Sequence, residues 1–255
     1  MNRTNWLAAS SLLTVSMLPF AALRADPPRG DATVASWRFE DGVKGWPADT
    51  AHVLADASGN GQNGLAVGNP RFVRIGAGPG GPALELVGDA QHGFVPDDSA
   101  FELTDSLTLE AIARIDRYSE SPQHLSYIVH RGDQRAGLDP WFLGILDTGQ
   151  LVFLIADEHN RNAVVRSPAP APRGRALHVA GTFDAEAGIL RLFVDGELVA
   201  TSDTEIRPFG PLAAGGAGIG IGNLAAGGNQ GFRGAIAEIR ISRAALQPEN
   251  FLTAR

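Results

Sequence analysis

The sequence predicts an all-β protein, an antiparallel two-sheet jelly-roll β-sandwich. Short runs in which apolar and polar residues alternate follow one another along most of the chain, and turn-forming residues separate them. A helical apolar period of useful length does not occur before Ala244. Glycine makes up 31 of the 255 residues, well above the usual ~7 %, which suits a chain with many turns.

The alternation identifies the strands in order. In the longest run, 107–115, apolar residues occupy the odd positions until Ile112 breaks the pattern, which indicates a bulge or a strand buried on both faces. Trp37 and Trp141 fall within strand patterns and are expected in the core. A closing turn is expected over 246–252. The expected strands are 34–39, 83–87, 107–115, 127–130, 141–146, 151–156, 163–166, 177–183, 189–194, 198–201, 217–222 and 232–241.

The connections between these strands contain residues suited to turns. Asp195-Gly196 is a two-residue hairpin signal, because both positions of such a turn need a positive φ. The loops 147–149 and 184–188 each end in a glycine suited to that conformation. Prolines at 168, 170 and 172 exclude the segment 167–173 from a central strand, so it is expected to cross the surface.

Residues 1–25 predict a cleaved secretory signal peptide. Arg3 precedes an uncharged apolar stretch over 7–18, and Ala22 and Ala25 are small residues at plausible cleavage points. The stretch is too short to span ~30 Å of hydrocarbon comfortably. We therefore expect a short linker over 26–33, a single domain over 34–251, and a secreted or periplasmic product without membrane insertion after processing.

Composition excludes several classes of function. The chain has no cysteine, which excludes a disulfide framework, a thiolate metal site and a cysteine nucleophile. The formal net charge of −7 becomes −9 once residues 1–25 are removed, because they contain Arg3, Arg24 and no acidic residue. With Lys44 as the only lysine and scattered arginines, the chain has no electrostatic footprint for nucleic acid.

Four stretches of the chain occur in an order and spacing typical of one family. They are 37–40 with 56–64, 80–95 with 107–111, 178–184 with 192–199, and 232–244. In these stretches the sequence resembles the LamG-like jelly-roll domains of the concanavalin A-like lectin/glucanase superfamily. The resemblance implies a jelly-roll fold across most of 34–251. It implies no single function, because this fold carries lectins, hydrolases, adhesion modules and spacers.

A candidate calcium site begins at Asp56. Asp56, Ser58 and Asn60 place oxygens at alternate positions, and Gly61 allows a sharp turn, as in the first half of a calcium loop. An equally good alternative is a local turn in which Asp56 and Asn60 bond only to nearby backbone.

The resemblance implies the remaining ligands of this site. In the resembling family, the loop can lie beside the last strand, whose Ile-Asp-Glu supplies an acidic pair to a structural calcium ion. Here that motif reads Ile236-Ala237-Glu238, so one carboxylate is missing. Regular alternation places Glu238 on the face opposite Ala237. The candidate metal ligands are thus Asp56, Asn60 and Glu238.

A second set of residues could bind a sugar. Trp46, between Gly45 and Pro47, is the tryptophan most expected to be exposed in a loop. The loop that follows residue 156 is dense in hydrogen-bonding groups, and its alternative role is that of a solvated hairpin tip. The candidate ligand-binding residues are Trp46, Asp157, His159, Asn160 and Arg161.

Catalytic motifs are not found. Glycosidases need two carboxylates that face each other across one bond, and the Glu-x-Asp-x-x-Glu pattern of the glucanase branch does not occur. Arg131-Gly132-Asp133 spells an integrin-type tripeptide, but its place at a strand end favours a turn.

The sequence therefore predicts a secreted, non-catalytic recognition module for an extracellular glycan, with a structural Ca²⁺ ion as an option. Two alternatives remain. One is a protein-interaction or envelope-scaffolding module that binds a surface protein, and the other is a divergent glycoside hydrolase or lyase.

Overall fold

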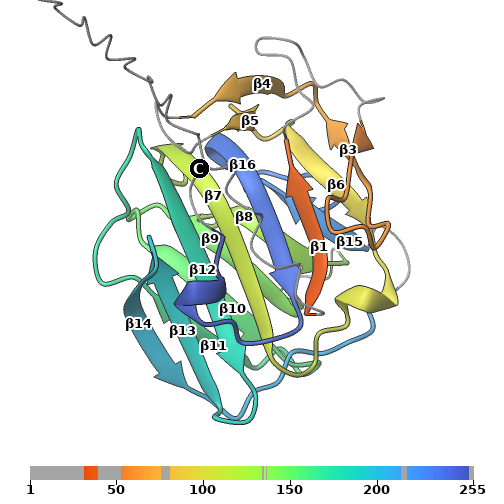
Figure 1. Ribbon diagram of the computed structural model, residues 1–255, viewed down its shortest axis with the longest axis vertical. Helices are drawn as coiled ribbons and strands as arrows, with labels where there is room; N and C mark the ends of the chain where they lie inside the picture. Colours follow the sequence, from red (N-terminus) through yellow and green to blue (C-terminus); the bar gives the residue numbers. More distant parts are fainter. Residues whose placement is uncertain are drawn as a thin grey trace, which may run out of the picture.

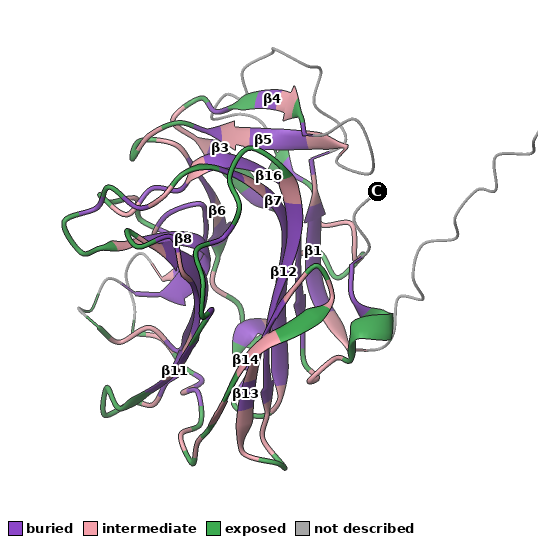
Figure 2. Ribbon diagram, turned by 90° about the vertical axis from the view of Figure 1, so that its left-hand side faces the viewer, coloured by how far each residue is buried: buried purple, intermediate pink, exposed green. Residues whose placement is uncertain are grey.

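The computed structural model describes residues 32–39, 53–75, 81–133, 135, 137–213 and 217–252. Within these residues, sixteen strands form two antiparallel sheets that stack face to face (Figures 1 and 2). The predicted two-sheet β-sandwich is confirmed. The expected signal peptide lies outside the described residues, and in the part of the chain that is described no helix is long and apolar enough to cross a membrane.

The first sheet, sheet A, contains the first and last strands side by side (Figure 1). Its order is β14 (Glu197–Asp203), β13 (Ile189–Val194), β12 (Ala176–Asp184), β7 (Leu107–Arg117), β16 (Arg233–Ser242), β5 (Pro82–Leu86) and β4 (Arg71–Arg74), and β1 (Thr33–Arg38) also pairs with β16.

The second sheet, sheet B, also has eight strands. Its order is β11 (Asn162–Arg166), β10 (Leu151–Ala156), β9 (Trp141–Leu146), β8 (Leu125–Gly132), β15 (Gly218–Ile221), β6 (His92–Pro96), β3 (Gly64–Val67) and β2 (Val53–Leu54). Two short 3₁₀ turns, Ser99–Phe101 and Pro248–Asn250, are the helical elements of the described chain.

The core lies between the two sheets (Figure 2). Trp37 and Trp141 have no exposed surface, as the sequence predicted for both. Each inner face is built by alternate residues of its strands, such as Leu109, Ala111 and Ala113 of β7. Burial of these apolar side chains is the main force that holds the sandwich together.

The predicted turns have the expected backbone geometry. Asp195 and Gly196 have φ of 51° and 83° between β13 and β14, and both values lie in the left-handed region that a two-residue hairpin requires. Gly149 and Gly188 also have positive φ. Pro168, Ala169 and Pro170 are exposed, so the proline-rich segment crosses the surface as expected.

The expected alternation fails at one point in β16. The register against β7 shifts between Ile236 and Glu238, which makes Ala237 a bulge residue. Ala237 packs with Ile112 on the outer face of sheet A, and Glu238 lies opposite Ile112 on that same face. The prediction that Glu238 and Ala237 occupy opposite faces was wrong, because the extra residue keeps both pointing outward.

The C-terminal segment is fastened to the outer face of sheet A. Glu110, which is completely buried, accepts hydrogen bonds from Arg240 Nε at 2.7 Å and from the backbone N–H of Leu252 at 2.8 Å. His178 Nε2 lies 3.0 Å from the second carboxylate oxygen, and the ring of Phe251 packs against His178. Glu110, Arg240 and His178 therefore hold the C-terminal segment against sheet A.

Candidate functional site

The carboxylate of Asp56 is surrounded by hydrogen-bond donors. One oxygen accepts from the backbone N–H groups of Ser36 and Ser58, and the other from the Ser58 hydroxyl and the Gln62 N–H, all at 2.8–3.0 Å. Burial alone would raise the pKa of Asp56, but these hydrogen bonds hold it below the usual range. The arrangement is the hydrogen-bonded turn that was one of the two alternatives.

The other two candidate metal ligands also have protein partners. Asn60 donates its amide N–H groups to the carbonyls of Thr33 and Val34. Glu238 lies 2.8 Å from Arg38 in an ion pair. Among the described residues, no group of three or more His, Asp or Glu side chains could hold a metal ion. A calcium ion would have to displace these partners, so the present arrangement does not fit the ion, and calcium binding stays a prediction to be tested.

A pocket of about 400 Å³ lies at one end of sheet B, and we call it the rim pocket. It is lined by residues 207–211, by Arg135 from the loop after β8, and by Asp157 and Glu158 from the loop after β10. These two loops share one end of the sheet because β8 and β10 run in the same direction. The volume falls within the range of small-molecule sites.

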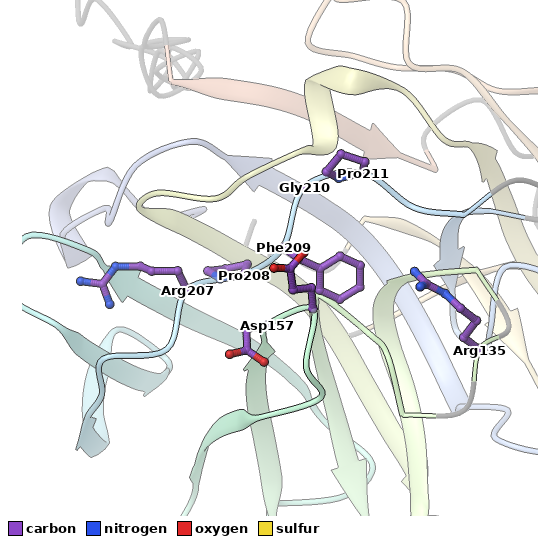
Figure 3. Close-up of a pocket in the computed structure, with 8 residues that line it drawn as sticks. Arg135, Asp157, Arg207, Pro208, Phe209, Gly210 and Pro211 are labelled. Carbon is purple, nitrogen blue, oxygen red and sulfur yellow. The ribbon is translucent and has the colours of Figure 1, made fainter.

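The ring of Phe209 is at the centre of the rim pocket (Figure 3). Its side chain is half-buried, and Arg135 places its guanidinium 5.8 Å from the ring centroid. Pro208 and Gly210 on either side are buried, and the Phe209 N–H donates to the Ala156 carbonyl. The main chain that carries the ring is therefore held in place.

The wall of the rim pocket is fixed from inside the sandwich. Arg131 has no exposed surface, pairs with both carboxylate oxygens of Asp97 and donates to the Gly210 carbonyl at 2.7 Å. Asp133 is buried and accepts from the Ala213 N–H and from Arg135. The burial of Arg131 and Asp133 agrees with the interpretation of this tripeptide as a strand-end turn rather than an adhesion motif.

The loop that carries Arg135 has a second support on the outer face of sheet B. Asp139 lies 2.9 Å from His130 Nε2 and accepts a hydrogen bond from the Tyr127 hydroxyl. Burial and the nearby carboxylate raise the pKa of Tyr127. Because His130 and Tyr127 are both buried, this cluster supports the loop and leaves no accessible site.

One loop with candidate ligand-binding residues borders the rim pocket. Asp157 lines it, while His159, Asn160 and Arg161 lie beside it in the same hairpin tip. Partial burial would raise the pKa of Asp157, but hydrogen bonds from Arg161 and the His159 N–H hold it below its usual range. Trp46 lies outside the described residues.

The sequence did not identify Phe209, Arg135 or Arg207 as residues that line the rim pocket. A signal for the ring was present, since Phe209 lies between Pro208 and Gly210 in a segment without a strand pattern. Trp46 is a candidate for the same reason, since it lies between Gly45 and Pro47. Chemically, a half-buried ring flanked by hydrogen-bond acceptors and donors can hold a ligand that has both an apolar face and hydroxyl groups.

Known structures share the fold. The binding domain of botulinum neurotoxin serotype G matches with a TM-score of 0.62 and 12 % identity, over 85 % of this chain and 49 % of that chain. The chain thus spans about half the length of the toxin domain that it matches. Domain 4 of AbnA, a GH43 extracellular arabinanase from Geobacillus stearothermophilus, matches with a TM-score of 0.59 and 17 % identity, over 86 % of this chain and 96 % of that chain.

Sequence comparisons identify the family. No curated protein sequence matches the chain significantly. Residues 87–250, more than half of the chain, match the sequence profile Laminin_G_3, described as concanavalin A-like lectin/glucanases superfamily. The chain therefore belongs to the concanavalin A-like lectin/glucanase superfamily, as the resemblance in its strands and turns suggested.

Proposed function

We propose that this protein is an exported, non-catalytic carbohydrate-binding module and that the rim pocket is its ligand site. The observation that carries the proposal is the half-buried Phe209 ring, which lines the rim pocket together with Asp157 and Glu158 and has the guanidinium of Arg135 above it. A sugar presents a C–H face that packs on an aromatic ring and hydroxyl groups that bond to charged side chains.

The arabinanase domain supports this proposal by analogy. Its solved structure holds arabinotriose, and the chain covers nearly all of that domain. A second similar structure, the binding domain of botulinum neurotoxin DC, is a complex with SialylT (TM-score 0.60, 17 % identity, over 87 % of this chain and 50 % of that chain). Because these identities are low, the likeness supports the class of ligand only as a fold-level analogy.

The carboxylates of the rim pocket favour binding over hydrolysis. A glycosidase places two carboxylates ~5–10 Å apart on opposite sides of the bond that it cleaves. In the described lining of the rim pocket, the carboxylates are the adjacent Asp157 and Glu158, and Asp157 is held by Arg161. A sugar bound here would contact two carboxylates that belong to the same loop, and not two that face each other across the bond to be cleaved.

The test is binding of purified residues 26–255 to an array of oligosaccharides and polysaccharides. We expect saturable binding that Phe209→Ala weakens at least about tenfold, since loss of an aromatic contact with its buried area costs well over 1 kcal/mol. Leu198→Ala is the control, because Leu198 is an exposed apolar residue that does not line the rim pocket. An unfolding curve for each variant shows whether the fold persists. A blank array from folded protein would contradict the proposal and favour a protein-interaction module.

A further inference from the structure

We propose that the rim pocket selects uncharged sugar residues and discriminates against acidic ones, such as sialic and uronic acids. This inference rests on the proposed function and narrows its ligand class. It comes from the way in which charged groups around the rim pocket are paired.

Two of the charges that line the rim pocket are already neutralised by partners. Arg135 lies 2.6 Å from Asp133, which is buried and aligned by the Ala213 N–H. Asp157 lies 2.7 Å from Arg161. An acidic sugar that approached Arg135 would have to compete with a carboxylate that the fold holds in place.

Glu158 is the lining carboxylate without such a partner. It is exposed, and it has no hydrogen bond or ion pair with any residue that the structure describes. Its negative charge therefore belongs to the lining of the rim pocket and is not cancelled by a partner among the described residues.

Arg207 does not offset that charge within the rim pocket. Its guanidinium points away from the Phe209 ring (Figure 3), stacks 5.1 Å from the centroid of the Phe183 ring and donates to the Ala185 carbonyl. On that side it borders a neighbouring open hollow that is also lined by Glu186, Asp203 and Glu205. The positive charge thus lies among carboxylates, and the region as a whole is negative.

The consequence is a Coulomb penalty for a second carboxylate. For charges about 6 Å apart, an effective dielectric constant of about 50, between the values for water and for a protein surface, gives a repulsion that lowers the affinity for an acidic sugar about five- to tenfold. Salt screens charges at such a surface, with a Debye length of ~10 Å at 0.1 M. The discrimination should therefore shrink as ionic strength rises.

The experiment compares matched glycans on one array: neutral oligosaccharides and their sialylated or uronic-acid counterparts. For wild type, we expect the affinity for each bound neutral glycan to exceed the affinity for its acidic counterpart about fivefold or more near 20 mM salt. Near 500 mM salt this difference should be smaller. Glu158→Gln should raise the acidic-to-neutral affinity ratio about fivefold. Glu197→Gln removes the same charge at the exposed β13–β14 hairpin and should leave the ratio unchanged.

The outcomes separate the two proposals. A wild-type protein that binds acidic glycans as well as their neutral parents, or an affinity ratio that Glu158→Gln does not change, overturns the selectivity while leaving carbohydrate binding intact. A wild-type protein that binds no glycan overturns the proposed function, and the selectivity with it. Unfolding curves for both variants confirm that the compared proteins are folded.

Discussion

A single carboxylate, Asp56, organises the turn between β2 and β3. It gathers three backbone N–H groups and one hydroxyl, and one of those N–H groups belongs to Ser36 in β1. The alternate oxygens at 56, 58 and 60 indicated that the residue was important. They could not decide between a cation and backbone N–H groups as its partner, because both are bound by the same oxygen atoms.

We expect Asp56→Asn to lower the free energy of unfolding by about 1–2 kcal/mol near neutral pH, since a partly exposed charged acceptor is lost. The pKa of Asp56 is lowered in the folded state, so this stabilisation is present above the ordinary pKa of 3.8 and is lost as pH falls through the folded value. Urea unfolding at several pH values measures it. Asp203→Asn, at an exposed residue, is the control, and an effect that stayed constant into acid would contradict this role.

Calcium binding at Asp56, Asn60 and Glu238 is tested separately. Because each residue has a protein partner and Arg38 is paired with Glu238, we expect the midpoint of thermal unfolding to be the same in millimolar Ca²⁺ and in EDTA. A calcium-dependent rise of several degrees, abolished by Glu238→Gln, would show that the ion displaces these partners and would restore the metal site that the sequence suggested.

At the scale of elements, the strands that the sequence revealed are those with several alternating residues. β9 and β10 were predicted with their observed bounds. β2 has only two residues, and β6 contains Gly93 and ends at Pro96, so neither has an alternation long enough to detect. The bulge at Ala237 was also invisible, because it depends on pairing with β7.

Residues 207–211 form one wall of the rim pocket, and Arg131 anchors this wall through the Gly210 carbonyl. Arg131→Met should lower the affinity for the array-identified glycan about tenfold, because the Gly210 carbonyl loses its buried donor and the Phe209 ring loses its fixed position. Hydrogen exchange at 209–213 should accelerate more than at β13. Unchanged exchange there, with reduced global stability alone, would show that Arg131 supports the core and not this wall.

For the whole molecule, alternation and turn chemistry were sufficient to predict the sandwich, since both are local properties of sequence. The rim pocket brings together residues 135, 157–158 and 207–211, and no local pattern links segments so far apart. Asp157 was a candidate because its loop is polar. Phe209 was not a candidate, because its place in the rim pocket depends on the path that the chain takes from β14 in sheet A to β15 in sheet B.

We propose that residues 1–25 direct the export of the whole molecule. If the full-length protein is expressed in a secreting bacterial host, we expect the released protein to begin after Ala22 or Ala25, which mass spectrometry of its N-terminus determines. Retention of residues 1–25 on the released protein would contradict cleavage of a signal peptide.

The most direct test of carbohydrate binding at the rim pocket is an NMR titration of isotope-labelled residues 26–255, first with arabinotriose and then with the neutral glycans bound on the array. We predict saturable shifts of backbone amides concentrated at Asp157, Glu158, Phe209 and Gly210. Saturable shifts concentrated elsewhere, for example around Tyr127 and Phe142 on the outer face of sheet B, would contradict the rim pocket as the site. No saturable shift with any of these sugars would contradict carbohydrate binding itself.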